Sequence, residues 1–303
     1  MNEIHEILQG ICAKDPRALG RAISIIEEGD RRAEALLQGI DEKSVLSTTI
    51  IGVTGSPGVG KSTLINQLIS YYRKQKCRIG IVAIDPSSPV TRGAFLGDRI
   101  RMMGHVLDQD VVIRSMAARG RLGGLCAAAG AAVRIMAYSG CNPVIVETAG
   151  VGQAEAEIVN LADVTVLVLA PGMGDDIQVM KAGLIEIADI IVINKADLPG
   201  VDALMMEIES VTRERDCLVC RTIATDATGI EQLAIIIRNI DQKKRRDGQF
   251  VLHRQKVWES EVLNWAMEMM RGRLMECIRS QTEKIKGDPR VIARTLIEEI
   301  WPS

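Results

Sequence analysis

The chain has 303 residues, a formal net charge of −2 and 47% hydrophobic residues. This length suits one large domain with extensions, or two domains. A nearly neutral charge gives no electrostatic reason to expect a nucleic-acid or membrane partner. The seven scattered cysteines are an odd number, which favours free thiols in a reducing cytoplasm over a disulfide framework. No signal peptide is visible at the N-terminus, and no apolar run approaches the roughly 18 residues that a membrane span needs. We therefore expect a cytoplasmic protein.

Residues 1–46 are predicted to form a helical N-terminal extension. Apolar residues recur there at spacings of three, four and seven, with charged residues between them; examples are Leu8, Ile11, Leu19 and Ile23. The segment carries no motif with chemical meaning, so we interpret it as a packing element or a partner surface.

Residues 47–240 are predicted to form an α/β domain. Short apolar runs alternate with helical patterns, and the runs are apolar throughout, as in strands that are covered on both faces. This repetition predicts a doubly wound, mostly parallel sheet, whose ligands sit beyond the carboxyl ends of the strands. The predicted strands are at 49–53, 79–84, 111–113, 143–146, 164–169, 190–193 and from 218 onward.

Residues 241–303 are predicted to form a helical C-terminal arm. The basic run at 243–246 is interpreted as a solvated linker. After it, Trp258, Val262, Trp265 and Met269 share one helical face. This apolar stripe could fold back on its own chain or pair with a second copy, and we favour a dimerisation arm.

A glycine-rich stretch between the first strand and its helix predicts a phosphate-binding loop. Glycines let successive N–H groups point at one anion, and the helix N-terminus adds partial positive charge. Lys61 would reach the β- and γ-phosphates, and the Ser62 hydroxyl would hold Mg²⁺. An ordinary glycine turn is the alternative. The predicted loop consists of Gly55, Ser56, Pro57, Gly58, Val59, Gly60, Lys61, Ser62 and Thr63.

Acidic residues at the ends of two strands predict a magnesium site opposite this loop. Asp85 follows the second strand and Glu147 ends the fourth, where a carboxylate can hold Mg²⁺ directly or through water. With Lys61 they form our predicted catalytic set. Gly150 would let a backbone N–H approach the γ-phosphate. Asp98 is a further metal candidate, with a helix N-cap as its alternative role.

The sixth strand ends in Asn194-Lys195-Ala196-Asp197, the guanine signature of GTPases. The Asp197 carboxylate can accept from two donors of guanine that adenine does not offer, and buried polar groups left unpaired would penalise the wrong base. Lys195 would lie along the base, and Asn194 would tie the base edge to the loop. In the segment 223–229, the Ala224 N–H is predicted to meet the guanine O6.

Two other patterns were weighed as chemical sites. Cys217 and Cys220 have metal-ligand spacing, but no second pair completes four ligands, so we interpret them as core cysteines. The three histidines, at 5, 105 and 253, are too dispersed to indicate a metal site.

Taken together, these motifs resemble the MeaB/ArgK-type GTPases over most of residues 10–240. The resemblance rests on the phosphate loop, the guanine signature and the segments 85–88, 96–98, 147–153 and 171–176. It implies a P-loop GTPase that binds GTP or GDP with Mg²⁺, and a homodimer joined by the C-terminal arm. It also implies a chaperone for a cobalamin-dependent acyl-CoA mutase of the methylmalonyl-CoA mutase type, which gates cofactor loading and protects the mutase. Residues 151–153 resemble a mobile switch that senses the partner.

Other functions stay open at this stage. Related proteins serve other corrinoid systems, and a kinase of a small molecule would use the same phosphate loop. A GTPase that inserts nickel into a metalloenzyme would need a cluster of Cys and His ligands near its nucleotide-sensing switch loops. No glutamine directly follows Gly150, so we expect slow hydrolysis until a partner orders residues 151–157.

Overall fold

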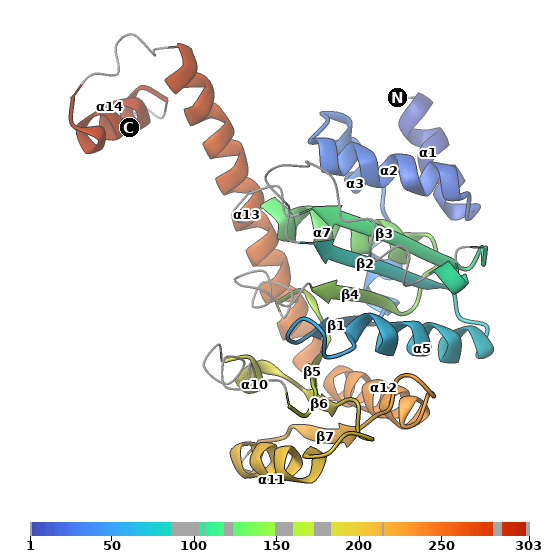
Figure 1. Cartoon of the computed structure of the whole chain (residues 1–303). Coiled ribbons are helices and arrows are strands. Elements are labelled where there is room, and N and C mark those ends of the chain that lie inside the picture. Colours follow the sequence, from blue (N-terminus) through green and yellow to red (C-terminus); the bar gives the residue numbers. More distant parts are fainter. Residues whose placement is uncertain are drawn as a thin grey trace.

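The computed structural model describes residues 2–85, 103–105, 107–117, 124–148, 160–172, 183–213, 215–280 and 287–300. Its centre is a sheet covered by helices on both faces, from which one long helix projects (Figure 1). Among the described residues, no helix combines the length and the apolar character that crossing a membrane requires.

The sheet has seven strands in the order β3-β2-β4-β1-β5-β6-β7, and every neighbouring pair is parallel. All residues of β1, β4, β5 and β6 are buried, as strands covered on both faces should be. The doubly wound parallel sheet is thus confirmed. The strands are β1 (Ile50–Thr54), β2 (Ile79–Asp85), β3 (Val111–Ala117), β4 (Val144–Thr148), β5 (Val164–Leu169), β6 (Ile190–Ile193) and β7 (Leu218–Arg221).

Two sets of helices cover the two faces. α5 (Lys61–Lys74) and α12 (Ile230–Arg246) share one apolar core with the sheet. On the other face, α7 (Gly124–Tyr138) covers the β2 and β4 side, while α10 (Leu184–Ile187) and α11 (Val201–Thr212) cover β5 and β6. A short 3₁₀ turn, Met103–His105, precedes β3.

The N-terminal helices are built onto the domain through α7. They are α1 (Asn2–Cys12), α2 (Pro16–Glu28), α3 (Arg32–Gln38) and α4 (Glu42–Ser47). α2 begins at the N-cap Asp15, whose side chain accepts from the Arg17 N–H. Ile11, Ile23 and Leu36 are buried in the same core as α7 and the sheet, and Arg114 of β3 hydrogen-bonds to Glu27 of α2. The predicted helical extension is confirmed, and it shares its core with the sheet.

The basic run at 243–246 is the last turn of α12, so its interpretation as a linker was wrong. Lys244 Nζ lies 2.6 Å from the Asp189 carboxylate, and Arg245 Nε lies 2.9 Å from Asp241 Oδ2. Asp189 is half-buried and Asp241 is buried. A prediction from charge alone did not identify these ion-pair partners.

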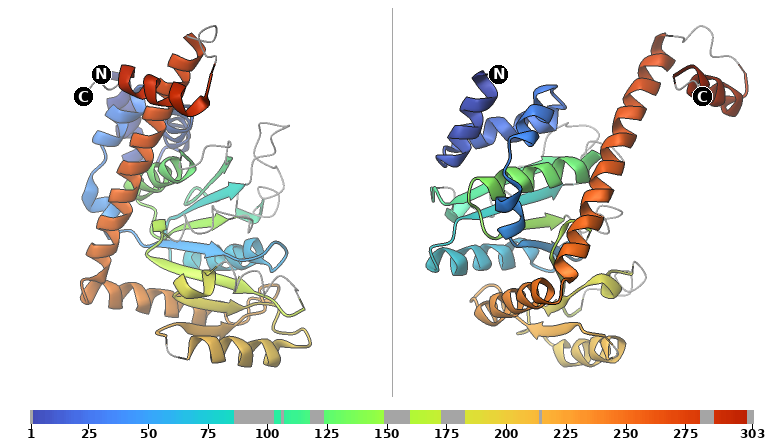
Figure 2. Two further views of the ribbon diagram at one scale, coloured as in Figure 1. Left: turned by 90° about the vertical axis from the view of Figure 1, so that its left-hand side faces the viewer. Right: turned by 180° about the vertical axis from the view of Figure 1, so that it is seen from behind.

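The C-terminal arm consists of α13 (Gln249–Ser280) and α14 (Pro289–Ile300). α13 starts beside the sheet and extends well past it, with α14 near its far end (Figure 2). Of the predicted stripe, Trp258, Val262 and Met269 are 58%, 49% and 66% exposed, whereas Trp265 is half-buried. Most of the stripe is therefore not covered by the chain's own domain.

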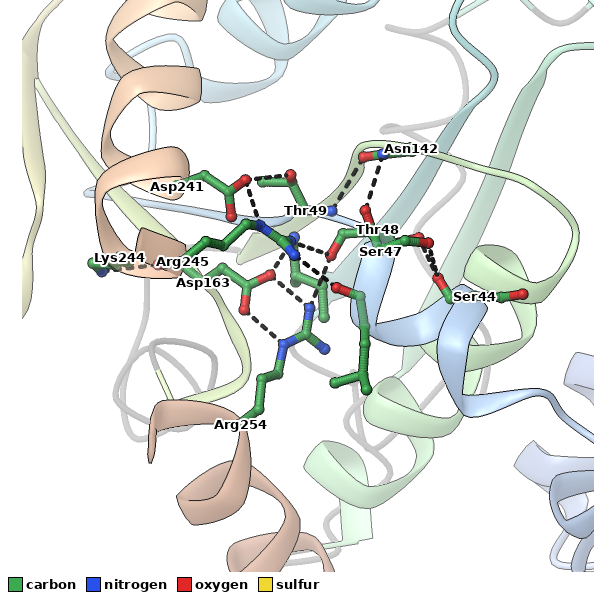
Figure 3. Close-up of polar contacts among 12 residues, drawn as sticks. Ser44, Ser47, Thr48, Thr49, Asn142, Asp163, Asp241, Lys244, Arg245 and Arg254 are labelled. Atoms are coloured by element: carbon green, nitrogen blue, oxygen red, sulfur yellow. Dashed lines mark hydrogen bonds and ion pairs between the residues drawn. The ribbon is translucent and has the colours of Figure 1, made fainter. Parts of the chain in front are cut away.

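A buried ion pair fixes the root of this arm (Figure 3). Asp163, 1% exposed, accepts from Arg254 at 2.6 and 2.7 Å and from the Ile50 N–H at 2.7 Å. Arg254 and Arg245 both donate to the Thr48 carbonyl. Burial raises the pKa of the Asp163 carboxyl, and the attraction of Arg254 opposes that rise. The start of α13 is thereby tied to the beginnings of β1 and β5.

Candidate functional site

The predicted phosphate loop connects β1 directly to α5. Gly55 has a φ of 141°, and a Cβ there would lie 2.1 Å from the Val168 carbonyl oxygen of β5. Gly60 has a φ of 98°, and its Cβ would lie 2.4 Å from Asn194 Nδ2. Both positions therefore need glycine for two reasons, an unusual backbone conformation and a close neighbour.

Lys61, the first residue of α5, folds back over the loop. Its Nζ donates to the Gly55 carbonyl at 2.6 Å and to the Ser56 carbonyl at 3.0 Å, and the residue is only 7% exposed. A buried ammonium group beside a helix N-terminus concentrates positive charge at the carboxyl end of β1. An anion such as a phosphate fits this position.

Ser62 and Glu147 form the second part of the site. The Ser62 hydroxyl donates to Glu147 Oε1 at 2.8 Å, and both residues are buried. Next to them, the Thr148 hydroxyl donates to Thr54 Oγ1 at 3.0 Å, which joins β4 to β1. Hard oxygen atoms at this spacing suit Mg²⁺, which takes one or two protein ligands and keeps several waters. The donor set thus fits the predicted ion.

Of the two other predicted acidic ligands, the structure describes only Asp85. Asp85 is the last residue of β2, the neighbour of β4, and its backbone pairs in register with Ala117. Asp98 and Gly150 lie outside the described residues, as does the predicted switch at 151–157.

The Asn194 side chain connects three segments. Its Nδ2 donates to the Val59 carbonyl of the phosphate loop at 2.8 Å. Its Oδ1 accepts from the Thr222 hydroxyl at 3.0 Å and from the Ala224 N–H at 3.1 Å. Asn194 is 2% exposed, so both ends of its amide are satisfied within the protein. The guanine signature therefore lies against the phosphate loop.

Lys195 and Asp197 complete the predicted base site. Lys195 has a φ of 55°, and its Nζ donates to the Gly58 carbonyl at 2.8 Å, so its stem runs along the loop. Asp197 is exposed at the end of the same turn. Lys195 therefore contacts the phosphate loop directly, the Ala224 N–H is linked to it through Asn194, and Asp197 follows Lys195 by two residues.

Thr222 and Val168 contribute to this geometry but were missed by the sequence analysis. Thr222 is fully buried and orients Asn194, and the Val168 carbonyl limits position 55 to glycine. The position of Thr222, two residues before Ala224, was the available signal. Nothing in the sequence marks Val168, because its role belongs to the backbone.

The cysteine pair at the edge strand is part of the core. Cys220 is buried in the core under α12, and Cys217 packs against the α10–α11 core. Burial raises the pKa of the Cys220 thiol to about 12 and that of the Cys217 thiol to about 11. Within the part of the chain described, no three His, Cys, Asp or Glu side chains are grouped to hold a metal.

Comparison with known proteins identifies the family. Residues 19–283 match the family model of the methylmalonyl Co-A mutase-associated GTPase MeaB. This chain belongs to the MeaB family of GTPases. A Pyrococcus abyssi protein whose name assigns it to the GTPases is 40% identical, with 98% of this chain and 97% of that protein aligned. The predicted resemblance to MeaB/ArgK-type GTPases is thus confirmed.

This chain is also similar to a bacterial and a mammalian protein. GTPase ArgK of Escherichia coli is 37% identical, over 59% of this chain and 55% of its own length. The mitochondrial methylmalonic aciduria type A homolog of Mus musculus is 30% identical, over 84% of this chain and 68% of its own.

Solved structures share the fold. A crystal structure of LAO/AO transport system kinase aligns with a TM-score of 0.66 and 24% identity, covering 99% of this chain and 98% of that one. HypB from Helicobacter pylori, solved in complex with nickel, aligns with a TM-score of 0.50 and 17% identity, covering 73% and 96%. At these identities the likeness concerns architecture, and it places the chain among proteins with the same parallel sheet.

Proposed function

We propose that this protein is a Mg²⁺-dependent GTPase and a chaperone for a cobalamin-dependent acyl-CoA mutase of the methylmalonyl-CoA mutase type. The observation that carries the proposal is the Asn194 side chain, which joins the guanine signature to the phosphate loop. One nucleotide bound there would touch both motifs. The name of the matching family and that of the mouse relative support a mutase of methylmalonyl-CoA as the partner.

In this proposal, residues 55–63 bind the phosphates and Lys61 neutralises charge on the β- and γ-phosphates. Ser62, with Glu147, Asp85 and Asp98, holds Mg²⁺, which supplies charge neutralisation in phosphoryl transfer. Asp197 and the Ala224 N–H select guanine, and Gly150 approaches the γ-phosphate. Each role keeps the residue that the sequence predicted.

Hydrolysis requires that an attacking water be aligned as well as that charge be neutralised. Lys61 and the loop amides act on the charge. Gln153, which lies three residues after Gly150, belongs to the segment that we propose the mutase orders. Turnover is then slow for the protein alone and faster in the complex.

We further propose that the cytoplasmic protein is a homodimer joined through α13. The exposed stripe of Trp258, Val262 and Met269 on a 32-residue helix supports this, because a second copy would bury apolar surface that now faces solvent. The doubly substituted variant Val262→Glu, Met269→Glu should sediment as a monomer. The variant Arg273→Ser, on the same helix, should remain a dimer.

Product analysis tests the catalytic part. Purified protein with GTP and Mg²⁺ should release GDP and inorganic phosphate and should phosphorylate no added small molecule. Chelation of Mg²⁺, or the substitution Ser62→Ala, should stop the reaction, whereas Ser70→Ala on the same helix should not. A phosphorylated acceptor would instead identify a kinase.

Capture from lysate of the native organism tests the partner. Protein loaded with a non-hydrolysable GTP analogue should retain an acyl-CoA mutase, and addition of that mutase should raise the GTP turnover rate. Retention of a different corrinoid enzyme or of a nickel enzyme, or equal rates with and without the mutase, would refute this part of the proposal.

A further inference from the structure

A cavity of about 610 Å³ lies at the root of the arm. Ile50, the first residue of β1, lines it, whereas the phosphate loop follows the other end of that strand. The cavity is therefore separate from the nucleotide site. Its volume falls in the range of roughly 300–1,000 Å³ that is typical of pockets for small molecules.

Three parts of the chain build its walls. Val45 comes from α4, Val133 from α7, and Phe250 and Trp258 from α13, while Leu161 precedes β5. These side chains are apolar and large, and they meet where the N-terminal helices, the sheet domain and the arm adjoin. Such junctions between structural units are preferred positions for ligand sites.

Most of the charge at the cavity is already compensated within the protein. Arg254 pairs with Asp163, and Arg245 pairs with Asp241 and stacks over the Phe250 ring at 4.0 Å. Arg134 is different. Among the described residues, no hydrogen bond or ion pair occupies its guanidinium, which experiences only the longer-range attraction of Glu261.

The Glu261 side chain packs against α7 at Gly130, a glycine one turn before Arg134. A Cβ at Gly130 would come 1.7 Å from Glu261 Oε1, so the carboxyl group occupies the space that any larger residue would fill. Gly130 and Arg134 are four residues apart and therefore face the same side of α7. Burial raises the pKa of the Glu261 carboxyl, and the attraction of Arg134 and Arg254 opposes that rise.

We propose that this cavity binds an apolar monocarboxylic acid, whose carboxylate pairs with Arg134 and whose hydrocarbon part packs among Val133, Phe250 and Trp258. The size of the cavity and its apolar walls determine the size and the apolar character of the hydrocarbon part of the ligand. Arg134, whose guanidinium has no hydrogen-bonded or ion-paired partner within the described part of the chain, sets its charged end, since a guanidinium binds a carboxylate through two parallel hydrogen bonds. A bound acid would contact α4, α7 and α13 at once and so would hold the arm against the domain.

Titration of the full-length protein with octanoate and, separately, with 1-octanol tests the proposal. Binding is followed by calorimetry and by the intrinsic tryptophan fluorescence, to which Trp258 of the cavity wall contributes. Octanoate should saturate one site per chain. Arg134→Gln should weaken octanoate at least about tenfold and leave octanol unchanged. Arg246→Gln, at an exposed arginine outside the cavity, should alter neither ligand.

Val133→Trp provides a second, steric test, because the indole ring of the new side chain would fill the cavity. It should abolish the binding of both octanoate and octanol while GDP affinity stays at the wild-type value. Absence of saturable octanoate binding to the wild-type protein, or equal octanoate affinity in the Arg134→Gln variant, would overturn the proposal. So would loss of dimerisation in the Val133→Trp variant without any octanoate binding to the wild type, because the cavity would then receive a second copy of the chain.

Discussion

Asn194 Nδ2 donates to the Val59 carbonyl over 2.8 Å. Asn194 follows β6, and Val59 lies in the loop after β1, with β5 between these two strands. The bond therefore spans two strand ends that are 135 residues apart in the chain. It explains why a base-recognition motif and a phosphate-binding motif can act on the same molecule.

Asp197→Asn should change the base preference. An asparagine amide donates where guanine also donates, so GTP affinity should fall by about a hundredfold or more, and xanthosine triphosphate should bind better than GTP. Competition binding with both nucleotides measures this. Asp202→Asn, at an exposed aspartate of α11, is the matched control. Undiminished GTP binding by the Asp197→Asn variant would exclude the assigned base site.

Gly60→Ala should damage the site through backbone strain and a collision. The φ of 98° disfavours alanine, and the added Cβ would meet the Asn194 amide. We expect a loss of about 1–3 kcal/mol in the free energy of unfolding together with weaker GTP binding. Gly20→Ala, in the middle of α2 with no atom within 4 Å of the new Cβ, should instead stabilise the protein slightly. Equal effects of the two substitutions would contradict this reading of the loop.

Thr222→Val should show whether Thr222 orients Asn194 for GTP binding or only stabilises the fold. Loss of the hydroxyl leaves the Asn194 Oδ1 with only the Ala224 N–H, so we expect a loss of about 1 kcal/mol in stability and several-fold weaker GTP binding. Thr212→Val is the comparison, because this buried threonine bonds only to the Ile208 carbonyl of its own helix. It should reduce stability similarly without any effect on GTP. A purely structural role for Thr222 would give the two variants the same nucleotide affinity.

Cys217 and Cys220 should resist alkylation in the native protein. With thiol pKa values of about 11 and about 12, both have far less reactive thiolate at pH 8 than an unfolded cysteine. Iodoacetamide should therefore label the exposed Cys12 first, as peptide mass spectrometry would show. Rapid native labelling of Cys220 would contradict its burial.

The same thiols should make stability fall at alkaline pH. Each pKa is 9.0 before the shift and higher in the folded chain, so the folded state retains these protons longer. Their contribution to the free energy of unfolding is complete below about pH 9 and is lost as the pH rises through the folded values. Denaturant titrations at several pH values measure this slope, which Cys220→Ala should reduce. An unchanged slope would show that Cys220 does not contribute to it.

Arg254→Gln should destabilise the arm root. It removes the partner of Asp163, which is 1% exposed, and an unpaired buried charge typically costs about 3–5 kcal/mol. Thermal and denaturant unfolding would show this loss, whereas Arg246→Gln on the exposed end of α12 should change stability little. A small effect at Arg254 would mean that solvent reaches Asp163 in solution.

The sheet could be predicted because each strand is marked by residues that are contiguous in the sequence. Each strand is a short apolar run, and the strand ends carry the motif residues. For this reason the sequence alone places Lys61, Ser62 and Asn194 at one edge of the sheet. Their positions follow from parallel topology alone.

The remaining features depend on contacts between distant parts of the chain. Thr222 matters because it meets Asn194, and Val168 matters because its carbonyl faces Gly55. Lys244, in the basic run at 243–246, pairs with Asp189, which lies much earlier in the chain. The composition of the chain and the spacing of its residues do not predict these contacts.

The central claim is that the strand ends around residues 55, 147 and 194 form one pocket for a guanine nucleotide. Calorimetric titration of the full chain with GDP and with ADP, both in the presence of Mg²⁺, tests it most directly. We expect saturable binding of one GDP per chain and at least about a hundredfold weaker binding of ADP. An absence of heat from GDP, or equal affinity for ADP, would contradict it.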